Sequence, residues 1–160
     1  MTATIIKAPE PLPLQRVKGV VPRSLFLSGS IEMGSAIDWQ KDMIEHIKDS
    51  LDYIFNPRRD VWDSSCTQSI HNKQFNEQVS WEMTALDISE TIFMYLAPST
   101  KSPISLLELG LYANSGKLIV CCPNDFWRHG NVEMVCQRYN IPLYGSYQQF
   151  LETYHGLRTI

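Results

Sequence analysis

Residues 102–113 read Ser-Pro-Ile-Ser-Leu-Leu-Glu-Leu-Gly-Leu-Tyr-Ala and follow closely on an apolar run at residues 91–97. The apolar run predicts a buried strand, and Pro103 suits the first turn of a helix because it has no N–H group to lose there. Glu108 is the lone carboxylate among the leucines of this predicted helix. Burying such a carboxylate is costly unless it is paired or used. The stretch therefore predicts a strand–loop–helix unit that carries a candidate catalytic acid.

Strand and helix signals alternate on both sides of this unit. The predicted strands are 24–28, 53–55, 91–97, 118–122 and 141–144. The predicted helices, one after each strand, are 37–51, 74–88, 103–115, 132–139 and 147–154. This alternation favours a parallel sheet with helices on both faces. Right-handed crossovers leave few arrangements, and the simplest is an α/β, flavodoxin-like, doubly wound, five-stranded sheet of order 2-1-3-4-5 in a single domain. Residues 1–23 hold four prolines and predict an extended arm without regular structure, so the domain is expected to cover residues 24–160.

The composition is that of a globular protein, with 44% apolar and 19% charged residues. The net charge of −3 gives no electrostatic reason to expect a nucleic-acid polymer or a membrane surface as a partner. No apolar run is long enough to cross a bilayer, and residues 1–18 lack the apolar stretch of a secretion signal. The four cysteines have no zinc-type spacing. We therefore expect a cytoplasmic protein with no metal and no other cofactor.

The expected sheet order brings two suggestive loops together. In this order the first and third strands are neighbours and the chain reverses its direction between them, which makes a crevice where ligands bind. The loop after the first strand holds Ser28, Gly29 and Ser30, and the loop after the third strand leads to Glu108. Because glycine lets the backbone approach a ligand closely, we expect residues 28–30 to contact substrate. The alternatives are a tight turn at Gly29 and, for Glu108, a helix carboxylate that faces solvent or pairs with an arginine.

Glu82 is the second candidate acid. It lies in one helical row with Phe75, Val79 and Leu86, and an acid in an apolar row is unusual. If this helix leans over the crevice, Glu82 and Glu108 form a pair of carboxylates whose surroundings separate their pKa values. The alternative places Glu82 at the edge of the row, turned toward water.

Two further loops follow strands at the same sheet edge. The loop 56–62 contains Arg58, Arg59 and Trp62, a combination that can hold a planar base and an anionic group, although two arginines in a surface loop are common. The loop 126–131 ends in Asn131 and either lines a substrate site, in its own chain or a neighbour's, or closes the end of the core with its aromatic residues.

Together these motifs resemble the nucleoside 2-deoxyribosyltransferase superfamily, and most closely its deoxyribosyltransferase-like branch. The matching segments are 25–30, 38–39, 56–59 with Trp62, 75–82, 102–110, 116–117 and 126–128 with 130–132. The resemblance covers about residues 24–145. It implies a flavodoxin-like homo-oligomer that cleaves the N-glycosidic bond of a small-molecule nucleoside or nucleotide.

By position, the resemblance implies that Glu108 is the nucleophile and that Glu82 handles the base. Glu108 would attack the anomeric carbon and form a glycosyl-enzyme intermediate, while Glu82 protonates the departing base. A second base, or water, then accepts the sugar, and two successive displacements retain its configuration.

Two positions depart from the transferases of this superfamily. Phe26 stands where many of them have a tyrosine that orients the nucleophile, and Ser102 stands where they often have an aspartate. Ser102, Ser105 and the start of their helix would suit the 5′-phosphate that the hydrolase branch holds. Transfer of 2-deoxyribose between bases is therefore the first expectation. The alternatives are hydrolysis of a (deoxy)nucleoside 5′-monophosphate at the same bond and, given Phe26, a nucleotide-binding module without turnover.

Overall fold

The structure is a computed structural model of the 160-residue chain, and it describes residues 2–13, 21–32, 36–61, 63 and 65–157. The predicted substrate-binding residue Trp62 lies outside these residues. The strands are β1 (Thr4–Lys7), β2 (Val21–Gly29), β3 (Tyr53–Asn56), β4 (Ser89–Tyr95), β5 (Leu118–Cys121) and β6 (Leu143–Tyr144). The helices are α1 (Trp39–Ile47), the short 3-10 helix η3 (Lys48–Ser50), α2 (Lys73–Ile88), α3 (Pro103–Tyr112), α4 (His129–Tyr139) and α5 (Tyr147–Leu157).

The strands form a parallel sheet in the order β1-β3-β2-β4-β5-β6. The strands β2 to β6 are the five predicted strands in chain order. Their order in the sheet, β3-β2-β4-β5-β6, is therefore the predicted order 2-1-3-4-5, and the flavodoxin-like class is confirmed. Over the part of the chain that the structure describes, the sheet has six strands and not five. The extra strand, β1, pairs with β3 in the register Thr4–Tyr53 to Lys7–Asn56. The expectation that residues 1–23 lack regular structure is therefore wrong for residues 4–7, because Ile5 and Ile6 supply an apolar edge strand ahead of the prolines. It is also wrong for residues 21–23, which form the start of β2.

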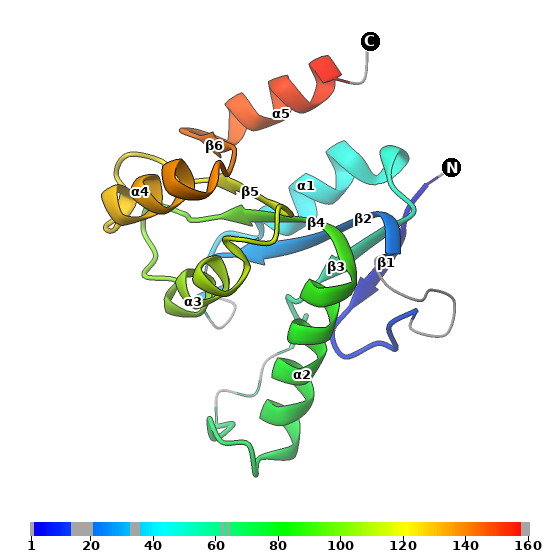
Figure 1. Cartoon of the computed structure of the whole chain (residues 1–160). Helices are drawn as coiled ribbons and strands as arrows, with labels where there is room; N and C mark the ends of the chain where they lie inside the picture. The colour runs from blue at the N-terminus through cyan, green and yellow to red at the C-terminus, as the bar shows by residue number, and fades with distance from the viewer. Residues whose placement is uncertain (1, 14–20, 33–35, 62, 64, 158–160) are drawn as a thin grey trace. The chain divides into compact units, whose positions relative to one another are not determined.

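Contacts along the chain divide it into two compact units, Met1–Leu27 with Met33–Ile92 and Ser28–Glu32 with Phe93–Ile160. In the first unit, α1 and α2 lie on opposite faces of β1, β3 and β2 (Figure 1). Both helices begin at side-chain caps, which satisfy N–H groups that have no partner within the helix. The carboxylate of Asp38 accepts a hydrogen bond from the Lys41 N–H at 3.2 Å, and the amide oxygen of Asn72 accepts one from the Phe75 N–H at 3.0 Å.

The buried face of α2 differs from the predicted row. Its buried residues are Gln78, Trp81, Ala85 and Leu86, whereas Phe75, Val79 and Glu82 of the predicted row are only partly buried. The reason is Trp81, whose indole packs 6.4 Å from the Phe26 ring and donates a hydrogen bond to the Glu10 carbonyl at 2.7 Å. This orientation of α2 places Glu82 beside the buried face, one helical turn after Gln78.

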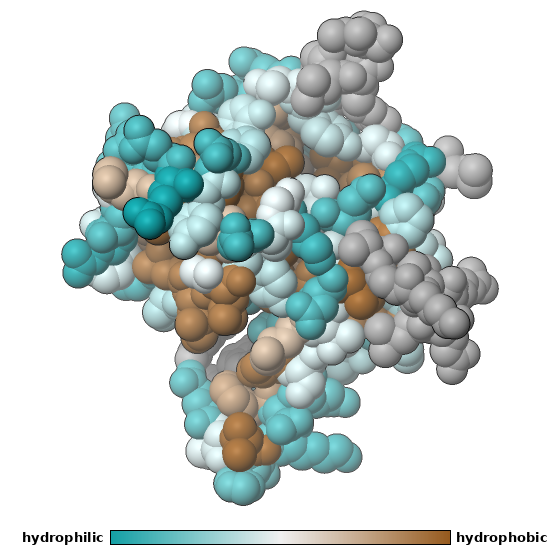
Figure 2. Space-filling view, viewed as in Figure 1, coloured by the Kyte–Doolittle hydropathy of each residue, from teal (hydrophilic) through white to brown (hydrophobic). Residues whose placement is uncertain are grey.

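In the second unit, α3 and α4 lie on one face of β5 and β6, and α5 lies on the other (Figure 1). The α5 residue Phe150 packs 4.2 Å from the ring of Phe93 in β4. On α3, the side chains of Ile104, Leu107 and Leu111 are 58–64% exposed and form an apolar stripe, which Figure 2 shows as a hydrophobic patch over this helix. None of the described helices combines the length and apolar character that a membrane span requires.

Candidate active site

Glu108 faces the loop that follows β2. Its side chain is half-buried, and its Oε2 accepts a hydrogen bond of 2.5 Å from the hydroxyl of Ser28. Both residues belong to the second unit. Ser28 was predicted to contact substrate. In the structure it is only 1% exposed, and its hydroxyl bonds to the Glu108 carboxylate. Phe26, two positions earlier in β2, is fully buried.

The loop 28–30 meets the end of β4, as the expected sheet order requires. The Ser30 N–H donates to the Tyr95 carbonyl at 2.9 Å. Gly29 has a φ of +135°, and a Cβ at this position would lie 2.2 Å from the Tyr95 oxygen. The close approach that glycine permits here is thus to the neighbouring strand, which explains Gly29 without a ligand.

Three buried hydroxyl groups form a closed triangle beside this loop. The Ser30 Oγ lies 2.7 Å from both the Thr100 Oγ1 and the Ser102 Oγ, and these last two atoms are 2.8 Å apart. All three side chains are at most 6% exposed, and Ser105, one turn further along α3, is 5% exposed. The structure therefore buries the hydroxyl-bearing residues predicted to bind substrate or phosphate, and it pairs Ser30 with Ser102.

Glu32 is a residue that the sequence reasoning missed. Its Oε1 accepts hydrogen bonds from the backbone N–H groups of Lys101 at 3.0 Å and Ser102 at 2.8 Å, directly before α3. Glu32 and Ser102 both have left-handed backbones, with φ of +48° and +46°, an uncommon conformation for residues other than glycine that costs about 1–2 kcal/mol. An acid two residues after a predicted switch-point loop is the sequence signal that could have identified Glu32.

Glu82, in the first unit, is half-buried and belongs to a polar network. The Gln78 Nε2 donates to the Glu82 Oε1 at 2.7 Å and to the Pro57 carbonyl at 3.0 Å. Burial raises the pKa of Glu82, while the hydrogen bond from Gln78 and the positive charge of Arg59 partly oppose that rise. This carboxyl group therefore holds a proton at a higher pH than an exposed glutamate does. The pairing of Glu82 with Glu108 stays a prediction.

The two predicted arginines differ in their surroundings. Arg58 donates to the carbonyls of Ala36 at 2.6 Å and Ile37 at 3.2 Å, and it lies 3.8 Å from the carboxylate of Asp38. These contacts fasten the chain ahead of α1 and explain Arg58 structurally.

Arg59 instead joins the network around Glu82. Its Nε donates to the Gln78 Oε1, and its buried Nη2, 4.0 Å from a Glu77 carboxylate oxygen, has no hydrogen-bond partner within the described part of the chain. An unsatisfied buried guanidinium N–H is costly, so this atom marks a place where a ligand acceptor would be favourable.

Asn131 lines a hollow of about 340 Å³ between α3 and α4, together with Leu106, Gly110 and Trp127. Leu106 and Gly110 each lie two residues from Glu108, which is about 160° around a helix. The structure therefore does not bring Asn131 together with Glu108 in the same chain.

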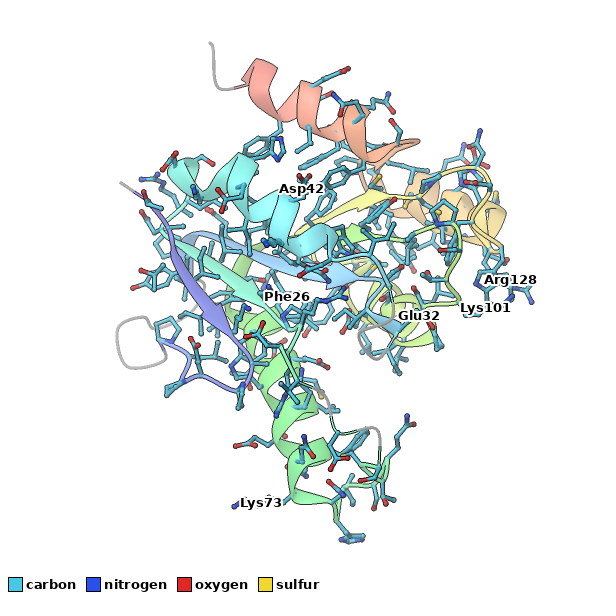
Figure 3. The ribbon with its side chains drawn as sticks, turned by 180° about the vertical axis from the view of Figure 1, so that it is seen from behind. Phe26, Glu32, Asp42, Lys73, Lys101 and Arg128 are labelled. Carbon is cyan, nitrogen blue, oxygen red and sulfur yellow. The ribbon has the colours of Figure 1, made fainter. Side chains whose placement is uncertain are left out.

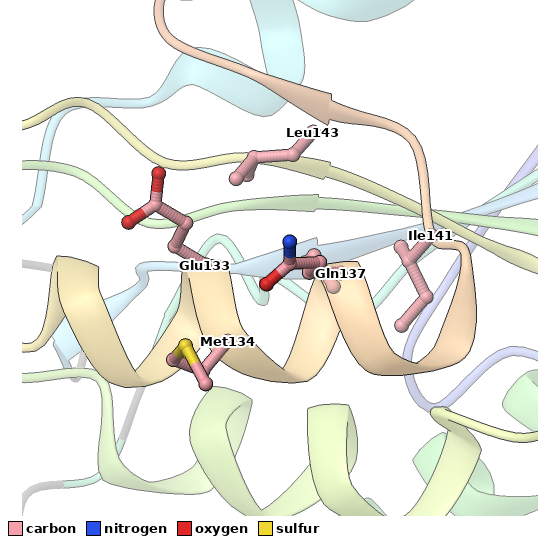
Figure 4. A pocket seen from close by; sticks show the side chains of 6 residues that line it. Glu133, Met134, Gln137, Ile141 and Leu143 are labelled. Carbon is pink, nitrogen blue, oxygen red and sulfur yellow. The ribbon is translucent and has the colours of Figure 1, made fainter.

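A larger hollow, of about 450 Å³, lies beside α4 and is lined by residues that include Glu133, Gln137 and Leu143 (Figure 4). It contains none of the predicted site residues. Its Cys136 thiol is buried, which raises its pKa to about 11 and keeps it protonated. Among the described residues, no group of three His, Cys, Asp or Glu could hold a metal ion.

The geometry thus gives a half-buried carboxylate at the end of two neighbouring strands, held by a serine hydroxyl, and a second glutamate with a raised pKa. A search of curated proteins finds no match to the chain. The family model described as nucleoside 2-deoxyribosyltransferase like matches residues 22–126, more than half of the chain. The matched segment includes Ser28, Glu32, Glu82 and Glu108. The chain therefore belongs to the nucleoside 2-deoxyribosyltransferase-like family.

Proposed function

We propose that the protein transfers a 2-deoxyribosyl group from one nucleobase to another through a covalent glycosyl–Glu108 intermediate. The observation that carries this proposal is the 2.5 Å hydrogen bond from the Ser28 hydroxyl to the Glu108 Oε2. It fixes one oxygen of a half-buried carboxylate at the carboxyl end of neighbouring strands, the place where α/β sheets bind ligands. A carboxylate so fixed is pre-oriented for attack, which lowers the entropic part of the barrier.

In the first half-reaction, a Glu108 oxygen forms a bond to the anomeric carbon of the sugar. The bond between that carbon and the base nitrogen breaks, and its electron pair goes to the base. Because the sugar is cation-like in the transition state, the negative charge of Glu108 stabilises it before the new bond is complete. In the second half-reaction, a nitrogen of the incoming base attacks the same carbon and the Glu108 carboxylate leaves.

We also propose that Glu82 supplies the proton that the departing base needs and takes it back from the incoming base. Its raised pKa supports this role, because a general acid works best when its pKa lies near the working pH. The Arg59 Nη2 beside the same network offers a donor for an acceptor atom of the base.

The test is an exchange assay on a deoxynucleoside, with and without a second free base. Transfer predicts a new nucleoside when the second base is present. Free base and free sugar, or sugar phosphate from a 5′-monophosphate, formed without an acceptor would instead indicate hydrolysis. Binding without any product would indicate a module without turnover.

The matched variants for this assay are Glu108→Gln and Glu133→Gln. Both remove one negative charge from the second unit, but Glu133 is exposed on α4 and lines a hollow that contains none of the predicted site residues. Glu108→Gln should lower kcat by at least about 1,000-fold, as expected when a covalent nucleophile is lost. Glu133→Gln should keep the wild-type kcat. Full activity in Glu108→Gln would remove this residue from its role.

We further propose that the protein is a homo-oligomer. The exposed apolar stripe of Ile104, Leu107 and Leu111 on α3 supports an interface on this helix.

A further inference from the structure

Glu32, Lys101 and Arg128 lie near one another in the second unit, beside the start of α3 (Figure 3). The backbone amides that precede α3 belong to residues 101 and 102, and such amides at a helix start attract anions. In this protein their partner is the carboxylate of Glu32, at 3.0 and 2.8 Å. A negative group of the chain itself therefore occupies the position that an incoming phosphate would need.

The hydroxyl groups next to these amides are also engaged. The Ser102 Oγ bonds with the hydroxyls of Ser30 and Thr100, and each of the three side chains is at most 6% exposed. To bind a phosphate here, the protein would have to break this triangle and expel the Glu32 carboxylate. Both changes raise the free energy of binding for an anion, and neither is needed for a neutral ligand.

The two cationic side chains of this region, Lys101 and Arg128, contact an aromatic ring. The Lys101 ammonium and the Arg128 guanidinium each lie 4.5 Å from the centroid of the Trp127 ring, so both stack on this indole. In addition, Glu108 contributes a second carboxylate to the same unit. An anionic ligand in this unit would therefore meet two carboxylates, Glu32 at the amides before α3 and Glu108, the candidate nucleophile.

We propose that Glu32 is a specificity-determining residue that excludes substrates carrying a 5′-phosphate and admits the neutral nucleoside. This inference rests on the proposed function, because it assumes that the sugar bound at Glu108 directs its 5′ end toward the amides of residues 101 and 102. The hydrogen bond between the hydroxyls of Ser30 and Ser102 links those amides to the loop whose Ser28 bonds to Glu108. The substrate class is therefore a nucleoside with a free 5′-hydroxyl, which can donate a hydrogen bond to the carboxylate.

The experiment compares kcat/KM for a deoxynucleoside and for its 5′-monophosphate in the wild type, Glu32→Gln and Glu133→Gln. The wild type should prefer the nucleoside by at least about tenfold, because the negative charge of the Glu32 carboxylate repels a dianionic phosphate beside it. Glu32→Gln should narrow that preference by at least about tenfold, mainly through a lower KM for the monophosphate. Glu133→Gln, which changes the net charge equally, should leave the ratio unchanged.

A wild-type preference for the monophosphate would overturn the proposal, and it would point to Lys101 and Arg128 as an anion site. An unchanged ratio in Glu32→Gln would also overturn it.

A binding measurement separates this proposal from the proposed function. In the Glu108→Gln background, thermal stabilisation by the two ligands reports affinity without turnover. Stronger stabilisation by the nucleoside, reversed or equalised by adding Glu32→Gln, supports the role of Glu32 even if no sugar transfer is found. Equal stabilisation by both ligands before Glu32 is changed contradicts it.

Discussion

Removing the Ser28 hydroxyl should slow the chemical step without preventing folding. Ser28→Ala deletes one donor to the Glu108 Oε2, which lies 2.5 Å away. A hydrogen bond to a charged group contributes about 1.5–3 kcal/mol. If that contribution is made mainly in the transition state, kcat should fall by about 10- to 150-fold, since each 1.36 kcal/mol corresponds to a tenfold change in rate.

The assay is single-turnover release of base from a deoxynucleoside, together with steady-state kcat and KM. A positioning role predicts that kcat falls while KM changes by less than about threefold, because uniform substrate binding is not affected. Ser28→Thr keeps the hydroxyl and should recover most of the rate. A wild-type kcat in Ser28→Ala, in a protein with wild-type thermal stability, would refute the argument that this hydrogen bond orients the nucleophile.

Three further outcomes follow from the structure. Burial raises the pKa of Glu82 above its ordinary value of 4.5, so the folded state holds this proton more tightly than the unfolded state. The free energy of unfolding should therefore decrease as the pH rises above 4.5, and urea denaturation should show a smaller decrease in Glu82→Gln. Gly29→Ala places a Cβ 2.2 Å from the Tyr95 oxygen and should lower the Tm by about 4–8 °C, whereas Gly110→Ala, with nothing within 4 Å, should not lower it. Leu107→Lys, on the exposed stripe of α3, should dissociate the proposed oligomer in light scattering without lowering the Tm of the chain.

The sheet order could be predicted because its signals are local. The apolar runs at 91–97 and 118–122 and the helix between them have clear lengths and clear ends. Strand β1 was not predicted because the four prolines of residues 1–23 favour an extended arm, although Thr4–Lys7 is a regular edge strand. The buried face of α2 was also misplaced, since one large side chain, Trp81, sets the helix orientation against Phe26 and no periodicity contains that information.

The candidate site was predicted in part. The meeting of loop 28–30 with Glu108 follows from sheet order alone, and the structure confirms that these segments are in contact. The hydroxyl groups of Ser28, Ser30 and Ser102 were predicted to contact a ligand. A sequence shows which polar groups are present, but it does not show which of them already form hydrogen bonds within the protein. Ser30 and Ser102 bond to each other, and Ser28 bonds to Glu108, so those atoms are engaged within the protein. Glu32 was not predicted because its partners are backbone amides about seventy residues away, which have no sequence signature; only its place two residues after the loop 28–30 pointed to it.

The covalent role of Glu108 is tested by the intact mass of the protein after rapid mixing with a deoxynucleoside and acid quenching. A covalent glycosyl–Glu108 intermediate predicts an added mass equal to one deoxyribosyl residue, located by peptide mapping on Glu108 and missing in Glu108→Gln. An adduct on another residue, or full turnover in Glu108→Gln, would contradict the claim that this carboxylate forms the covalent bond to the sugar.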